Sequence, residues 1–310
     1  MRVLFWGTPE FATAPLRALI GEGFDVVGVV TQPDKAVGRS RSKLEPSPVK
    51  RVAIEEGIPV LQPDRPRGEE FLEQMKSLEP DISVVVAYGH ILGSAVIALP
   101  RLGTINIHAS LLPKLRGAAP IQAAIREGHT ETGVTIMRMV QALDAGPSIL
   151  QVKTPIPEDE TYGELQVRLA EIGALALIEA LALIDIGRAA ATQQNDSEAT
   201  YASKIERAMT QIDWSADART VSRIIRAYDP RPGAIARLNG ADVKVFGARL
   251  APKSRESDPG EVLEITPTGM TVACGSGAIQ IAIVHPAGKR RLSPEAWARG
   301  RGIAVGDRLS

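Results

Sequence analysis

The 310-residue sequence has almost no cysteine, since Cys274 is the only one. This excludes an intrachain disulfide and a zinc site built on several thiolates. The sequence also lacks an apolar stretch of transmembrane length, and its first residues enter a strand-like run at 3–6 without a cleavage-site pattern. We therefore expect a cytoplasmic protein with no membrane segment and no metal.

Net charge and aromatic side chains are scarce as well. The chain has 36 basic and 36 acidic residues, and aromatic residues make up only 4% of it. Overall composition therefore predicts neither a nucleic-acid partner nor a membrane partner. The charge is uneven, however, because residues 205–310 hold 16 basic and 11 acidic side chains. This excess permits a polyanionic partner, although solvation of the surface explains it equally well.

Length and hydrophobicity predict two domains, since about 100–200 residues is a common domain size and 44% of the chain is hydrophobic. Up to about residue 187, short apolar runs alternate with helix-length segments. This alternation predicts an α/β fold, namely a Rossmann-like, doubly wound and mostly parallel sheet. The predicted strands are 3–6, 26–30, 60–61, 82–87, 104–107 and 134–139, and the predicted helices are 10–20, 49–56, 71–78 and 162–187.

The chain changes character after the helix predicted at 162–187. That helix has apolar residues at a spacing of three or four, which predicts one buried face: Leu165, Leu169, Ile172, Leu175, Ile178 and Leu181. The polar run 193–198 has no apolar period, so we expect a linker there. A helix at 218–228 and five short strand-like runs then predict a small all-β, OB-like barrel. The expected domains are 1–188 and 207–310, joined by a linker at 189–206.

The turn after the first predicted strand bears on cofactor choice. Its sequence, Gly-Thr-Pro-Glu-Phe-Ala at 7–12, does not match a dinucleotide-binding fingerprint, because Pro9 and Ala12 stand where the second and third glycines belong. We expect a tight strand-to-helix turn at Gly7 rather than NAD binding.

Asn106 and His108 are the first candidate catalytic residues. They are two positions apart on a predicted strand, so their side chains share a face near the carboxyl end, where open α/β sheets bind ligands. An amide and an imidazole can stabilise a carbonyl oxygen as it gains charge and can manage a proton, although a lone strand histidine is more often structural. Asp144, in a turn after the strand at 134–139, either completes this set or caps its own turn.

The segment Asn-Ile-His-Ala-Ser-Leu-Leu-Pro at 106–113, followed by Arg-Gly-Ala-Ala-Pro-Ile-Gln at 116–122, closely resembles the methionyl-tRNA formyltransferase family. The first segment and the later aspartate are shared by the wider group of 10-formyltetrahydrofolate-dependent enzymes, so they specify folate formyl chemistry. Residues 116–122 are the narrower signature. Further matches extend the resemblance along nearly the whole chain: 7–9, 31–34, 46–50, 87–89, 132–137 and 212–214.

The resemblance implies a one-carbon group transferase (EC 2.1.2.9). Such an enzyme moves the formyl group of 10-formyltetrahydrofolate onto methionyl initiator tRNA for translation initiation. The catalytic set would be Asn106, His108 and Asp144. The folate site would be lined by Ser110, Leu111, Leu112 and Pro113, with Ile91 and Leu92 at the pterin pocket unless these two are ordinary core.

Two residues depart from the family pattern. His90 stands where an apolar residue is expected, which argues against a direct role for it. Ala142 replaces the glycine expected before Leu143 and Asp144, which puts the position of the Asp144 loop in question.

The resemblance also assigns the tRNA contacts. A basic insertion at 34–45 would contact phosphates or bases of the acceptor stem through Lys35, Arg39, Arg41 and Lys43, although a solvated loop is the generic alternative. A basic stripe on the predicted barrel would follow the tRNA: Lys289, Arg290, Arg291, Arg299, Arg301 and Arg308. We expect initiator methionyl-tRNA and folate as partners, no membrane partner, and a monomer.

Three other functions remain open at this point. A formyltransferase for a small molecule, such as glycinamide ribonucleotide or an amino-sugar nucleotide, would share the folate chemistry but not the basic insertion or 116–122. A non-catalytic RNA-binding module would not need Asn106, His108 and Asp144 together. A formyltetrahydrofolate hydrolase would release formate without any acceptor.

Overall fold

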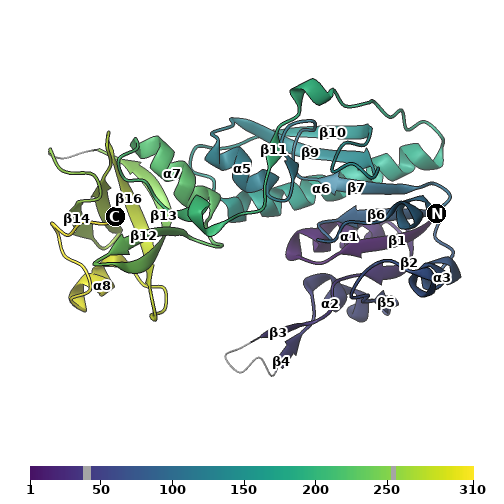
Figure 1. The fold of residues 1–310 in the computed structure, drawn as a ribbon, viewed down its shortest axis with the longest axis horizontal. Coiled ribbons are helices and arrows are strands. Elements are labelled where there is room, and N and C mark those ends of the chain that lie inside the picture. Colours follow the sequence, from purple (N-terminus) through teal and green to yellow (C-terminus); the bar gives the residue numbers. More distant parts are fainter. Residues whose placement is uncertain (38–42, 253–255) are drawn as a thin grey trace. The chain divides into compact units, whose positions relative to one another are not determined.

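The computed structural model describes residues 1–37, 43–252 and 256–310 (Figure 1). The chain forms two compact units. Unit 1 comprises Met1–Gly117, Thr132–Thr154 and Gln166–Tyr201, and unit 2 comprises Ala118–Glu131, Pro155–Leu165 and Ala202–Ser310. Unit 2 thus includes two segments that precede residue 166 in addition to the last third of the chain. The predicted domain boundaries and linker stay a prediction.

Unit 1 is built on a seven-stranded sheet in the order β10-β9-β7-β6-β1-β2-β5 (Figure 1). The β1 strand pairs in parallel with β2 and β6, β6 with β7, and β2 with β5, whereas β9 is antiparallel to β7. The predicted α/β fold with a mostly parallel sheet is therefore confirmed. The strands are β1 (Arg2–Gly7), β2 (Asp25–Val30), β5 (Val60–Leu61), β6 (Ile82–Val86), β7 (Thr104–His108), β9 (Glu131–Arg138) and β10 (Ser148–Pro155).

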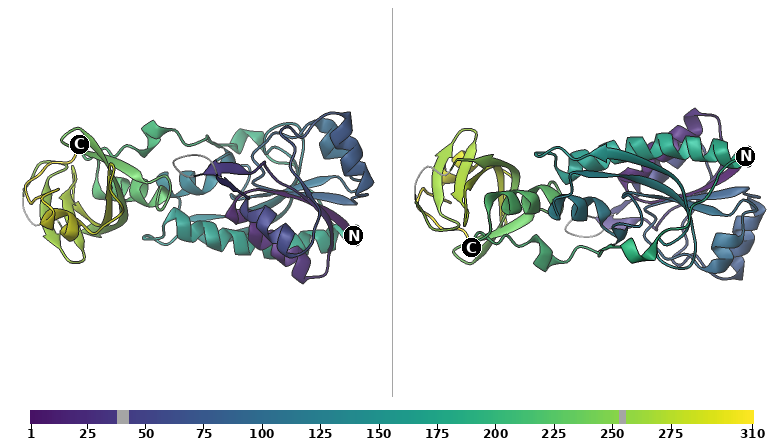
Figure 2. Two further views of the ribbon diagram at one scale, coloured as in Figure 1. Left: turned by 90° about the horizontal axis from the view of Figure 1, so that it is seen from below. Right: turned by 90° about the horizontal axis from the view of Figure 1, so that it is seen from above.

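Helices cover both faces of this sheet. In Figure 2, α1 and α6 lie along one face and α3 and α4 along the other. The central strands are consequently buried on both sides, which explains their continuous apolar runs. The helices are α1 (Thr13–Gly21), preceded by the short 3-10 helix η1 (Glu10–Ala12), then α2 (Pro48–Glu55), α3 (Glu69–Ser77), α4 (Ser94–Ala98) and α6 (Tyr162–Asp185).

The buried face of α6 differs from the predicted one. Leu165, Leu169 and Leu181 are buried as expected, but Leu175 is 74% exposed. Steps of three residues fall short of the 3.6-residue turn, so each step rotates the side chain about 60° away from the starting face. The face turned to the sheet instead includes Gly173, where an added Cβ would lie 3.1 Å from Ile107 in β7. The helix therefore packs closely against the strand that carries the candidate site.

Unit 2 contains a five-stranded sheet in the order β12-β13-β16-β15-β14, with antiparallel pairing throughout. The predicted small all-β fold is confirmed, and Trp214 and Phe246 are buried as expected. Helices α7 (Ala218–Ala227) and α8 (Pro294–Arg299) pack on its core. The strands are β12 (Ala234–Leu238), β13 (Ala241–Ala251), β14 (Val262–Thr266), β15 (Gly269–Ala273) and β16 (Ala278–Pro286).

Several short elements complete the fold. They are β3 (Lys35–Val37), β4 (Lys43–Glu45), β8 (Arg116–Gly117), β11 (Tyr201–Ala202), α5 (Pro120–Arg126), η2 (Asp196–Glu198) and η3 (Arg207–Thr210). Within the described ranges, no helix combines the length and apolarity that crossing a membrane requires.

Candidate functional site

The candidate site begins at the carboxyl end of β7. His108 is buried and Asn106 is half-buried, and their separation of two residues places both side chains on one face of the strand. The Nε2 atom of His108 lies 2.9 Å from the carbonyl oxygen of Leu115. A carbonyl only accepts, so Nε2 must carry a proton in this contact. The Nδ1 atom is then the ring nitrogen left for proton transfer.

Asp144 meets His108 at that nitrogen. Its Oδ2 atom lies 3.6 Å from Nδ1 of His108, and its side chain is 14% exposed. The same oxygen accepts a hydrogen bond of 2.8 Å from the backbone amide of Gly117. Ala142 is exposed in the same loop, and Asp144 faces His108 with this residue in place. The structure thus brings His108 and Asp144 together. Asn106 lies two residues before His108 on the same face of β7.

Two residues on neighbouring strands form hydrogen bonds with the backbone of the predicted folate loop, residues 110–113. Thr135, opposite His108 on β9, donates to the carbonyl of Ser110 at 2.7 Å and accepts from the amide of Leu112 at 3.1 Å. Gln151 on β10 donates to the carbonyl of Leu112 at 2.7 Å. Sequence reasoning missed both, because neither lies in a chemically distinctive motif. The Ser110 hydroxyl donates to the carbonyl of Lys114, at the other end of this turn.

Ile91 and Leu92 do not share one environment. Ile91 is 87% exposed, whereas Leu92 is 3% exposed and packs in a core cluster with Trp6 and Tyr88. His90 is exposed beside them. The predicted contact of Ile91 and Leu92 with the pterin stays a prediction.

A second pair of polar residues reaches the Asp144 loop from distant parts of the chain. Gln194 donates through Nε2 to the carbonyls of Asp144 (2.8 Å) and Gly146 (2.7 Å). Its Oε1 accepts from Nε and Nη2 of Arg116 at 3.1 and 2.8 Å. Gln194 was predicted to lie in a linker, because the surrounding residues are polar and show no apolar periodicity. The one available signal was Arg116, the first residue of the narrower signature.

The basic insertion is only partly within the described residues. Lys35 and Lys43 are exposed on the paired strands β3 and β4, while Arg39 and Arg41 lie outside the described residues. The base of the hairpin is anchored by an ion pair between Asp34 and Lys50 at 2.7 Å. Hydrogen bonds from Lys50 and then from Gln62 hold the pKa of the Asp34 carboxyl below its usual value.

The six basic residues predicted to form a stripe are all exposed, as tRNA contact would require. Three of them also contact neighbours in the protein. Arg291 lies 3.9 Å from the centre of the Phe246 ring, Arg299 is 3.9 Å from Glu295, and Arg308 is 3.3 Å from Asp258. Their predicted contact with tRNA stays a prediction.

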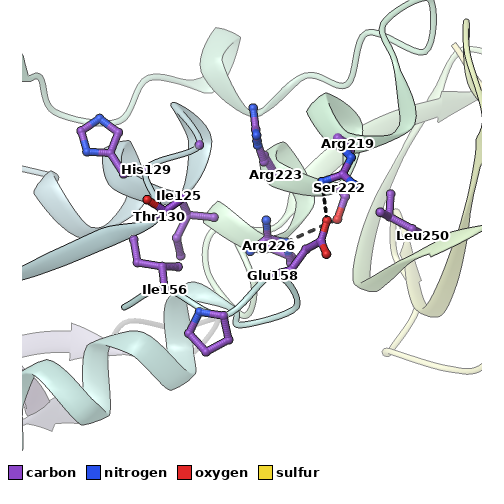
Figure 3. Close-up of a pocket in the computed structure, with 12 residues that line it drawn as sticks. Ile125, His129, Thr130, Ile156, Glu158, Arg219, Ser222, Arg223, Arg226 and Leu250 are labelled. Atoms are coloured by element: carbon purple, nitrogen blue, oxygen red, sulfur yellow. Dashed lines mark hydrogen bonds and ion pairs between the residues drawn. The ribbon is translucent and has the colours of Figure 1, made fainter. Parts of the chain in front are cut away.

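Three arginines line a pocket of about 280 Å³ within unit 2 (Figure 3). Arg219, Arg223 and Arg226 follow one another on α7 at spacings of four and three, which puts them on one side of the helix. Glu158 is the acidic side chain in the lining, and it contacts Arg219 at 2.6 Å. The pocket therefore presents more positive than negative charge.

Arg223 is the lining arginine best placed to bind an added anion. Arg226 is buried and already donates to the carbonyl of Glu160 at 2.8 Å and to the hydroxyl of Ser222 at 3.3 Å. Burial, and then the nearby charge of Arg223, lower the pKa of the Arg226 guanidinium. Arg223 is half-buried and lies against Gly128, where an added Cβ would collide with its guanidinium. A phosphate at this position would relieve the repulsion between the two arginines.

The described residues contain no group of three or more His, Cys, Asp or Glu side chains arranged to hold a metal ion. What unit 1 does present is an amide, an imidazole and a carboxylate at one strand end. That combination can stabilise a developing oxyanion and move a proton.

Comparison with known proteins gives consistent matches. Residues 1–181 match the formyl transferase family, and residues 204–302 match the formyl transferase C-terminal domain. A methionyl-tRNA formyltransferase from Methylococcus capsulatus is 46% identical over 309 residues, covering 100% of this chain and 99% of that protein. Another from Pseudomonas fluorescens is 48% identical over 290 residues, covering 93% and 90%.

The fold is also similar to solved structures. HypX from Aquifex aeolicus in complex with tetrahydrofolic acid matches with a TM-score of 0.68 at 22% identity. The match covers 97% of this chain and 47% of HypX. At this identity the likeness concerns the fold alone.

Proposed function

The chain belongs to the methionyl-tRNA formyltransferase family, and from this premise we propose that it transfers the formyl group of 10-formyltetrahydrofolate to the amino group of methionyl initiator tRNA. The products are formylmethionyl-tRNA, used in translation initiation, and tetrahydrofolate. The observation that carries the proposal is the pair of His108 and Asp144 at the end of β7, in a chain that matches family members over its whole length. The cytoplasmic location and the monomeric state stay predictions.

The reaction needs one bond made, one broken and one proton moved. The methionine nitrogen attacks the formyl carbon, a new C–N bond forms, and the carbonyl electron pair moves onto oxygen. The bond between that carbon and N10 of the folate then breaks, and the proton lost by the amine ends on N10. The protein must therefore stabilise an oxyanion and carry a proton between two nitrogens.

The three candidate residues suit these tasks. The amide of Asn106 donates to the oxyanion. His108 also donates to it when protonated, and Nδ1 is the nitrogen that faces Asp144 at 3.6 Å. Asp144 stabilises the positive imidazolium and takes part in moving the proton from the amine to N10. Folate would bind along the 110–113 loop, which Thr135 and Gln151 hold in place.

The acceptor is tested with three parallel substrates. Formyl transfer from 10-formyltetrahydrofolate should occur with methionine-charged initiator tRNA, and not with charged elongator tRNA or free methionine. Radiolabelled formyl in precipitated tRNA measures the product. Folate turnover without formylated tRNA would contradict the proposed acceptor and point to a small amine or to water.

Arg223 offers a test of tRNA contact in unit 2. We propose that it binds a backbone phosphate, so Arg223→Gln should weaken tRNA binding and lower the slope of log K against log salt concentration by about 1. The matched control is Arg249→Gln, since Arg249 is exposed and adjacent in sequence to Leu250 of the pocket lining, but points to the other side of β13. If both variants and the unaltered protein have equal salt slopes, Arg223 does not bind a tRNA phosphate and the pocket is not part of the tRNA-binding surface.

A further inference from the structure

We propose that Gln194 is a positioning residue for this reaction. Its side-chain amide, oriented by Arg116, fixes the backbone of the Asp144 loop and so sets the distance between the Asp144 carboxylate and His108. The inference rests on the proposed catalytic role of Asp144.

The contacts of Gln194 are with the backbone on either side of the Asp144 side chain. Its Nε2 atom donates to the carbonyl of Asp144 itself and to that of Gly146 two residues later, at 2.8 and 2.7 Å. The side chain of Asp144 leaves the same backbone and receives the amide of Gly117 at 2.8 Å. The backbone and the side chain of Asp144 are thus each held by hydrogen bonds from other segments of the chain.

The backbone of the Asp144 loop adopts an uncommon conformation and has little room to change it. Asp144 has φ of 48°, in the left-handed region that non-glycine residues rarely occupy. The hydrogen bond within the turn, from Ala145 to Ala142, is long at 3.4 Å. Gly146 is packed so tightly that an added Cβ would collide with the carbonyl oxygen of Arg138. Losing the Gln194 donors would let this strained turn relax and shift the carboxylate.

Arg116 determines which way the Gln194 amide faces. Its guanidinium only donates, so the Gln194 oxygen must turn toward it and the Gln194 nitrogen toward the two loop carbonyls. Arg116 is 3% exposed, and its charge is balanced by Asp196 at 2.7 Å. A buried arginine, the first residue of the narrower signature, therefore acts through the amide on the catalytic loop.

This arrangement requires an amide and would fail with a carboxylate of the same shape. In Gln194→Glu, the oxygen facing Arg116 is retained, but the other oxygen faces two carbonyl oxygens and can donate to neither. We expect kcat to fall by about 10–100-fold, the cost typical of misplaced catalytic groups, while KM for folate and for tRNA changes less than about twofold.

The adjacent glutamine provides the matched control. Gln193 is exposed, and Gln193→Glu makes the same change of charge one residue away. It should keep kcat and KM unchanged. Arg116→Lys retains the charge but loses the two-pronged contact with Oε1, so it should lower kcat in the same way as Gln194→Glu.

A double-mutant cycle separates positioning from general damage. When Asp144→Asn has already removed the carboxylate charge, adding Gln194→Glu should cost less than about threefold more, because the two changes disable the same function. A full, additive loss in that background would overturn the inference, as would identical kcat values for Gln194→Glu and Gln193→Glu. Failure of the unaltered chain to formylate methionyl-tRNA would instead contradict the proposed function.

Discussion

His108→Ala should lower kcat for formyl transfer by about 10²–10³-fold, the cost typical of losing one oxyanion donor in an acyl-transfer site. The imidazole is buried, donates to the Leu115 carbonyl through Nε2 and presents Nδ1 to Asp144. Removing it eliminates the group that carries the proton and one donor to the oxyanion. The KM for folate should change little, since the loss is confined to the transition state. Single-turnover formylation of methionyl-tRNA measures the effect.

A second substitution separates chemistry from folding at this position. In His108→Gln, the side-chain amide can still donate to the Leu115 carbonyl but cannot take up a proton, so the fold should persist while kcat falls as in the alanine variant. His285→Ala, on β16 of unit 2, is the histidine control and should retain full activity. If His108→Gln retains near-normal turnover, the proton-transfer role of His108 is wrong.

Asp144→Asn should also lower kcat by about 10²–10³-fold, because general acid–base assistance is commonly worth that much. An asparagine keeps the size of the side chain and can still accept the hydrogen bond from Gly117, which isolates the loss of charge beside His108 Nδ1. A positive imidazolium then loses the carboxylate that stabilises it. Single-turnover formylation of methionyl-tRNA by the variant and by the unaltered protein measures the loss.

The control for Asp144 is Asp185→Asn at the exposed end of α6, which should leave the rate unchanged. Because His108 and Asp144 act together, the double variant His108→Ala, Asp144→Asn should be no slower than the slower single variant within about threefold. Multiplicative losses would show that the two residues contribute independently and would contradict the proposed pairing.

The fold was largely predictable because its central strands are buried on both faces. Such strands appear in the sequence as short runs rich in Val and Ile, which is why β2, β6 and β9 were located within a few residues. The β10 strand was missed because it is a half-exposed edge strand. Polar residues interrupt its apolar residues, so it has no continuous apolar run to recognise. Helix α8 was missed because it has only six residues, although Ser293 and Pro294 at its start repeat the cap-and-proline pattern of α2.

The candidate site was predictable only where it is local in the sequence. Asn106 and His108 share a strand, and the strand period of two is enough to place them on one face. Gln194 was not predictable, because its partners on the loop are backbone carbonyls. Every residue has a carbonyl, so such a contact leaves no complementary side chain to recognise in the sequence.

The division of the chain between its two units imposes an order on folding during synthesis. Residues 118–131 leave the ribosome early, but they pack with the last third of the chain, including α7. The α5 segment can therefore pack in unit 2 only after α7 has been synthesised, by which time most of unit 1 has left the ribosome. Nascent chains expose such segments to wrong partners, so the interval between synthesis of α5 and of α7 is when this protein is most vulnerable to aggregation.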